Sequence, residues 1–101
     1  MTDLKNTHAV QKIARISGKP GQASVLRAAL MKLEKATKAE DGCLEFSFYQ
    51  ALSVEDSFIL LEHFANEEAL KIHMQLPHTQ SFFKEQLTEG IQAVDLPSLD
   101  L

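Results

Sequence analysis

The chain has 101 residues, of which 45% are hydrophobic and 24% charged, and it carries a net charge of -4 and one cysteine. This composition indicates a single soluble globular domain and excludes an intrachain disulfide, while fourteen acidic against ten basic residues disfavour a nucleic-acid partner. No apolar run approaches the roughly 20 residues that span a bilayer, so no membrane partner is expected. The first residues lack the pattern of a signal peptide, which predicts a cytoplasmic protein.

The predicted domain spans residues 8–96, between a loose N-terminal segment at 1–7 and a C-terminal tail at 97–101. Alternating apolar residues predict a first strand at 8–17, in which Lys12 interrupts the apolar face. A turn that contains glycine and proline follows this strand, because these two residues favour the backbone angles of turns.

A helix is predicted after this turn, because apolar side chains recur every three or four residues from Leu26 to Thr37. Gly42 is predicted to end this helix through a left-handed cap. Strands at 43–52 and 57–65 then form a hairpin. Three side chains of the first of these strands are expected on one face: Leu44, Phe46 and Phe48.

The rest of the chain predicts two helical pieces and a last strand. Asn66 caps the first piece, which ends at Pro77 because the residue before a proline avoids helical angles. The second piece covers about residues 78–88 with Phe82, Phe83 and Leu87 inward, Gly90 stops it, and residues 91–96 form the last strand. The resulting β-α-β-β-α-β order is that of a ferredoxin-like α+β fold, with an antiparallel sheet and helices on one of its faces.

The predicted strand at 57–65 is apolar on both of its faces. Its alternating residues are Phe58, Leu60, Glu62 and Phe64 on one face, and Ile59, Leu61, His63 and Ala65 on the other. The helices of so short a chain cover only one face of the sheet, so the other face needs a second cover. We therefore expect a homodimer in which sheet faces pack together.

Four short motifs follow one another along the chain in an informative order and spacing. They are Lys19-Pro20-Gly21, Glu40-Asp41-Gly42-Cys43-Leu44, Glu62-His63-Phe64 and His73-Met74-Gln75-Leu76-Pro77-His78. Together they resemble the antibiotic-biosynthesis-monooxygenase domain, a branch of the dimeric α+β barrel superfamily, over about residues 9–95. The resemblance implies a ferredoxin-like protomer in a sheet-to-sheet dimer.

The same resemblance implies several possible reactions, so fold likeness alone does not assign one. Some members oxidise phenols or hydroquinones with O2 and no cofactor. Because a deprotonated phenol can give an electron to O2 directly, such a protein needs only a base and a dry aromatic pocket. A cofactor-free monooxygenase of a small phenol or hydroquinone is therefore the leading hypothesis. The alternatives are an isomerase of a small phosphorylated sugar and a non-catalytic dimer that binds a small ligand or serves in stress. The acidic net charge favours a neutral substrate.

Two residues are predicted to be catalytic. Glu62 shares a strand face with apolar residues, where a carboxylate is costly unless it is paired or protonated. It is therefore a candidate base, or the partner of a catalytic histidine. The alternative is a structural role as a hydrogen-bond acceptor. The resemblance implies a pocket histidine at His73, which can act as acid or base near neutral pH, whereas a satisfied helix residue is the alternative.

Three further residues are predicted to bind the substrate. Phe64 and Phe82 are expected to be aromatic walls of the pocket, although core packing is the commoner role of such residues. The resemblance to the sugar-handling branch implies that His78 lies at the pocket mouth, and a helix cap is the alternative.

Neither a metal nor a cofactor is expected. His73 and His78 are five residues apart with Pro77 between them, which is not the i,i+4 helical spacing that suits zinc. The haem-degrading branch of the family uses a pocket tryptophan and a ligand histidine on the last helix. This chain has no tryptophan, and Phe83 falls where that histidine is expected.

Overall fold

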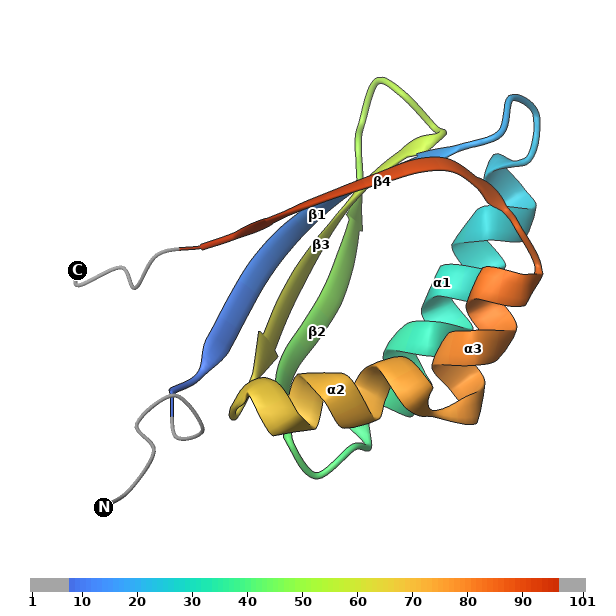
Figure 1. Ribbon diagram of the computed structural model, residues 1–101. Coiled ribbons are helices and arrows are strands. Elements are labelled where there is room, and N and C mark those ends of the chain that lie inside the picture. The colour runs from blue at the N-terminus through green and yellow to red at the C-terminus, as the bar shows by residue number, and fades with distance from the viewer. Residues whose placement is uncertain (1–7, 97–101) are drawn as a thin grey trace, which may run out of the picture.

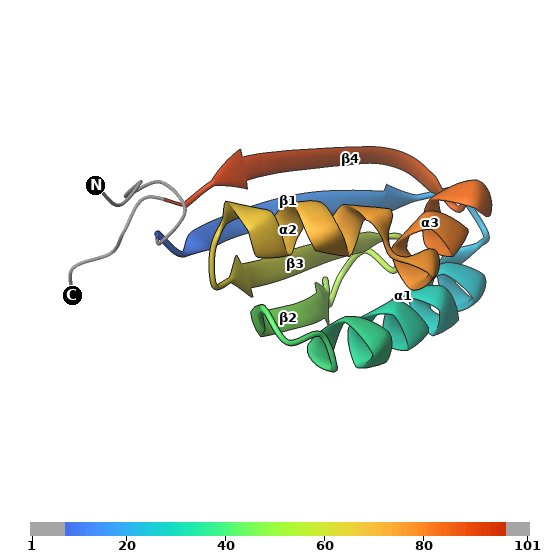
Figure 2. The ribbon, with the colours of Figure 1, turned by 60° about the horizontal axis from the view of Figure 1, so that its bottom comes forward.

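The sheet consists of four antiparallel strands, and the computed structural model describes residues 8–96 of the chain. The strands are β1 (Val10–Gly18), β2 (Cys43–Gln50), β3 (Ser57–Phe64) and β4 (Thr88–Asp95). They lie in the order β2-β3-β1-β4, so that β1 is central and β4 is an edge strand (Figure 2). The predicted terminal segments, 1–7 and 97–101, lie outside the described residues.

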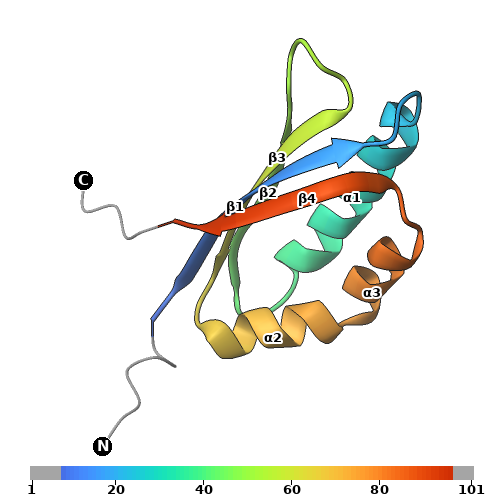
Figure 3. The same ribbon diagram turned by 45° about the horizontal axis from the view of Figure 1, so that its top comes forward.

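Three helices lie on the same face of the sheet (Figures 1 and 3). They are α1 (Ala23–Lys38), α2 (Glu67–Gln75) and α3 (Pro77–Lys84). This arrangement confirms the predicted ferredoxin-like α+β fold, with the second helical region divided into two short helices. No helix within the described residues is long and apolar enough to cross a membrane.

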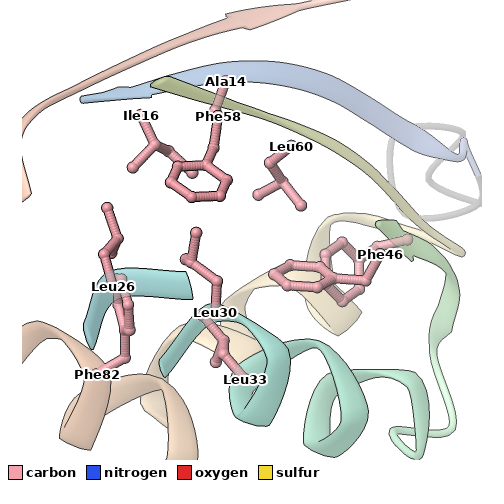
Figure 4. Packing of buried hydrophobic residues seen from close by; sticks show 10 residues of the cluster. Ala14, Ile16, Leu26, Leu30, Leu33, Phe46, Phe58, Leu60 and Phe82 are labelled. Carbon is pink, nitrogen blue, oxygen red and sulfur yellow. The ribbon is translucent and has the colours of Figure 1, made fainter. Parts of the chain in front are cut away.

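The hydrophobic core lies between the helices and the sheet. Figure 4 shows Leu26, Leu30 and Leu33 of α1 and Phe82 of α3 pointing toward side chains of the strands. The strand side chains of this core are Ala14, Ile16, Phe46, Phe58, Leu60 and Phe64. The helical stripe and the inward face of β3 therefore lie where their spacing predicted.

Gly42 has a different role from the predicted helix cap. Helix α1 ends four residues earlier, at Lys38, and Ala39 caps it with ordinary right-handed angles. A Cβ atom at Gly42 would collide with the Cβ atom of Ala69, and the Gly42 carbonyl accepts a hydrogen bond from the Ala65 amide at 2.8 Å. The glycine therefore lets the turn after α1 approach the start of α2 closely.

A bulge at the start of β2 overturns the prediction for Leu44. Cys43 pairs with Phe64 and Glu45 pairs with His63, which leaves Leu44 as an extra residue without a partner. The bulge shifts the alternation by one residue, so Cys43 packs against the core while Leu44 is 59% exposed. Phe46 and Phe48 lie beyond the bulge and keep the predicted inward face.

The predicted ends of the last two helices agree with the structure only in part. Asn66 caps α2 as predicted, with its Oδ1 accepting a hydrogen bond from the Ala69 amide at 2.8 Å. Pro77 ends α2 and is also the first residue of α3, where its missing amide proton costs nothing. Gly90 does not stop α3: the helix ends at Lys84, Gln86 makes the turn with φ 51°, and Gly90 lies within β4.

Candidate functional site

A cavity of about 350 Å³ lies between the sheet and the helices. Most of its lining is aliphatic or aromatic, and its polar or charged residues are Lys12, Glu62, His73 and Thr79. Met74, Phe83 and Ile91 belong to the lining and are each more than 40% exposed, so they mark the mouth. Such a volume is at the small end of ligand pockets and suits one small molecule.

The imidazole of His73 is the most firmly held polar group of this cavity. Its side chain is 4% exposed, and its Nδ1 lies 2.8 Å from Oε2 of Glu40. The same carboxylate oxygen lies 2.6 Å from Nε2 of His78, whose side chain is 24% exposed. A carboxylate only accepts hydrogen bonds, so both ring nitrogens donate to Glu40.

The fold brings these three residues together from separate elements. Glu40 lies in the turn between α1 and β2, His73 in the last turn of α2, and His78 in the first turn of α3. The close approach of Gly42 to Ala69 holds the Glu40 turn against α2. The break at Pro77 turns α3 away from α2, so the two histidines meet at one carboxylate although they do not share a helix face.

The ring of His73 is also fixed by aromatic neighbours. Its centroid lies 5.0 Å from the Phe64 ring and 5.2 Å from the Phe46 ring. Within residues 8–96, the side-chain hydrogen bonds of His73 involve only Nδ1, with Glu40 and, at 3.4 Å, with Oγ1 of Thr79. Because Glu40 accepts the proton on Nδ1, Nε2 keeps a lone pair that can accept a proton from a molecule in the cavity.

Glu62 contributes the carboxyl group of the cavity lining. It projects from β3 on the helix side of the sheet, and its backbone neighbours across the sheet are Lys12 and Phe46. Burial raises the pKa of the Glu62 carboxyl above its usual range, and the positive charge of Lys12 opposes part of that rise. Lys12 itself bonds to Asp95 on β4, with 2.6 Å between Nζ and Oδ1.

The raised pKa of Glu62 predicts a pH-dependent cost to stability. The folded state holds the Glu62 proton to higher pH than the unfolded chain does, so its stability falls as pH rises from the usual carboxyl pKa through the folded pKa. We expect the difference in free energy of unfolding between Glu62→Gln and the wild type, measured with urea, to favour the variant more at pH 7 than at pH 4. The control is Glu55→Gln, in the exposed loop between β2 and β3. Equal gains of Glu62→Gln at both pH values would contradict this reading.

The predicted site residues divide into two groups in the structure. Glu62, His73 and Phe82 line the cavity. Phe64 is fully buried beside the ring of His73 and is not part of the cavity lining, because its place on β3 lies under α2. His78 is likewise outside the lining and bonds to Glu40 instead.

His73 and His78 lack the i,i+4 spacing of a helical zinc motif, but the break at Pro77 and the carboxylate of Glu40 bring their rings to 6.1 Å between centroids. Sequence reasoning gave Glu40 no role. It lies 33 residues from His73, and only its place in the motif Glu40-Asp41-Gly42-Cys43-Leu44 marks it in the sequence. Glu62 and His73 line one cavity, but the carboxylate that bonds His73 is that of Glu40.

Comparison with known proteins identifies close relatives of this architecture. Residues 9–85 match the family model described as antibiotic biosynthesis monooxygenase. Rv0793 of Mycobacterium tuberculosis is 32% identical over 97 residues, which are 93% of this chain and 95% of that protein. YjcS of Bacillus subtilis is 43% identical over 58 residues, which are 57% of this chain and 55% of that protein.

Solved structures agree with the sequence comparison. The structure of Rv0793 superposes with a TM-score of 0.83, over 93% of this chain and 98% of that one. PA3566 of Pseudomonas aeruginosa is 26% identical and superposes with a TM-score of 0.85, over 97% of this chain and 99% of that one. The element order and the packing of helices on one sheet face are thus those of a known structural group.

Proposed function

The chain belongs to the antibiotic biosynthesis monooxygenase family, and from this premise we propose that it is a cofactor-independent monooxygenase of a small phenol or hydroquinone. The observation that carries the proposal is the combination of a largely apolar cavity with one imidazole whose free Nε2 is held in place by Glu40. An apolar cavity suits an aromatic substrate and O2, and the imidazole supplies the one base that the reaction needs.

The proposed reaction begins with proton transfer. Nε2 of His73 takes the hydroxyl proton of the phenol, and the phenolate gives one electron to O2. The resulting radical and superoxide join at the para carbon, forming a C–O bond. Loss of the proton on that carbon and cleavage of the O–O bond leave a quinone, and the released oxygen takes up both this proton and the proton held by His73 and leaves as water. One oxygen atom of O2 thus enters the product, and the substrate supplies all four electrons.

The other polar groups of the cavity fit a neutral substrate. Glu62, with its raised pKa, can exchange a hydrogen bond with a substrate oxygen, and Phe82 covers the aromatic ring. Lys12 is the only cationic side chain among the described lining residues, and it is bonded to Asp95. A phosphorylated sugar would need more positive charge than this, so the oxygenase is favoured over the isomerase.

The proposed active form is a homodimer. The outer face of the sheet carries five apolar or aromatic side chains at its centre: Ile13, Tyr49, Ile59, Leu61 and Val94. Tyr49 and Val94 are more than half exposed, and no described helix covers this face (Figure 3). Packing two such faces together removes this apolar surface from water, which is the main driving force of association.

The reaction is tested with 1-naphthol as a probe, using untagged protein dialysed against a chelator. Under ¹⁸O2 we expect 1,4-naphthoquinone with one labelled oxygen, with a rate proportional to protein concentration. Heat-denatured protein and anaerobic incubation are the controls. Saturable binding of the naphthol without any product would favour the alternative of a non-catalytic ligand-binding dimer, and unlabelled quinone would exclude oxygen transfer from O2.

A further inference from the structure

The cluster of Glu40, His73 and His78 has the composition of a metal-ligand set. Each residue offers one ligand atom, and the three atoms lie within 4.8 Å of one another. Two imidazole nitrogens and one carboxylate oxygen are the ligands of many sites for divalent transition metals. We propose that these three residues bind a divalent transition-metal ion, with Zn²⁺ or Co²⁺ as the fitting probes.

The distances permit a metal ion after small movements. A tetrahedral zinc ion with bonds of about 2.0–2.1 Å holds its ligand atoms about 3.4 Å apart. The carboxylate oxygen now lies 2.8 and 2.6 Å from the two nitrogens, as expected when protons occupy the place of the metal. Opening these contacts to about 3.4 Å takes about 0.6 Å between Glu40 and His73 and about 0.8 Å between Glu40 and His78, which small rotations of the Glu40 carboxylate and of the partly exposed His78 side chain supply.

The surroundings of the cluster also favour a cation. The carboxylate of Glu40 is 10% exposed, and within residues 8–96 its ion-pair partners are the two histidines alone, without a lysine or arginine. His73 is almost completely buried, which makes one ligand rigid, while the exposed edge of His78 opens a path for the ion and for a water ligand. Three protein ligands with one open position resemble the coordination of catalytic rather than structural zinc.

Metal binding would change the chemistry of His73. The ion takes the lone pair of Nδ1, so the ring proton moves to Nε2, which becomes a hydrogen-bond donor instead of an acceptor. If the proposed function holds, the bound metal therefore removes the base and switches turnover off. The metal site itself does not depend on that function, because it rests only on the contacts of the cluster.

Cobalt titration of the untagged protein tests the site without any measurement of activity. We expect one Co²⁺ per chain and visible absorption of the intensity typical of four- or five-coordinate cobalt. His78→Gln should weaken binding by about tenfold or more, at least as much as losing a second-shell partner does. The matched control is His8→Gln, because His8 is exposed ahead of β1 and outside the cluster; this variant should bind as the wild type does.

A second measurement uses the wild type alone and so does not depend on the folding of a variant. In long-range ¹H–¹⁵N spectra, one equivalent of Zn²⁺ should shift Nδ1 of His73 and Nε2 of His78 and leave His8 and His63 unchanged. Cobalt that keeps the weak absorption of the aqua ion, or zinc that shifts only His8 and His63, would overturn the proposal.

Discussion

His73→Gln is expected to lower the turnover of a phenol by at least about 100-fold, the usual contribution of a general base. The substitution removes the only imidazole that lines the cavity within the described residues, while Glu62 remains. The KM for the substrate should change little, because the aromatic lining that binds the ring is untouched. The measurement is steady-state quinone formation, with His8→Gln as the control.

His73 is buried between Phe46 and Phe64, so a second variant guards against loss of the fold. His73→Phe keeps an aromatic ring beside these two residues but has no basic nitrogen, and it should be as inactive as His73→Gln. Circular dichroism and urea unfolding report whether each variant is folded. A folded His73 variant with wild-type turnover would show that this residue is not the base.

Leu61→Lys is expected to convert the proposed homodimer into a monomer. Leu61 lies opposite Ile13 and Ser47 in the sheet, near the centre of the apolar outer face. Two lysines brought together there would lose their water shell without an anionic partner, a cost of several kcal/mol per ion. Sedimentation at micromolar concentration should give about twice 11.3 kDa for the wild type and 11.3 kDa for the variant.

The control for this change is Ile72→Lys. Ile72 is half exposed on α2, on the opposite side of the molecule, and the same charge there should leave the dimer intact. A wild-type protein that sediments as a monomer, or a Leu61→Lys variant that remains a dimer, would contradict the sheet-to-sheet arrangement.

The sequence predicted those parts of the fold that short-range chemistry determines. The stripe from Leu26 to Thr37 and the alternation of Phe58 and Leu60 depend only on the period of a helix or strand, and the Asn66 cap depends on one local hydrogen bond. The bulge that exposes Leu44 was not predictable in this way, because pairing with β3 determines the register of β2.

In the candidate site, too, local patterns predicted some features and long-range contacts determine the others. His73 could be singled out from its motif, and the inward position of Glu62 follows from strand alternation. The contact of Glu40 with both histidines requires the turn after α1 to meet the junction of α2 and α3, and no local pattern encodes that meeting. Phe64 was expected at the cavity wall, but α2 crosses over it and places it in the core.

The proposed base chemistry depends on Glu40 holding His73 with its proton on Nδ1 and its lone pair on Nε2. The most direct test is a long-range ¹H–¹⁵N spectrum of the metal-free protein near pH 7.5, which reports the protonation of each ring nitrogen. We expect a protonated Nδ1 and an unprotonated Nε2 for His73, with this preference weakened in Glu40→Gln. A proton on Nε2 in the metal-free wild type would leave the cavity without its base and contradict the account.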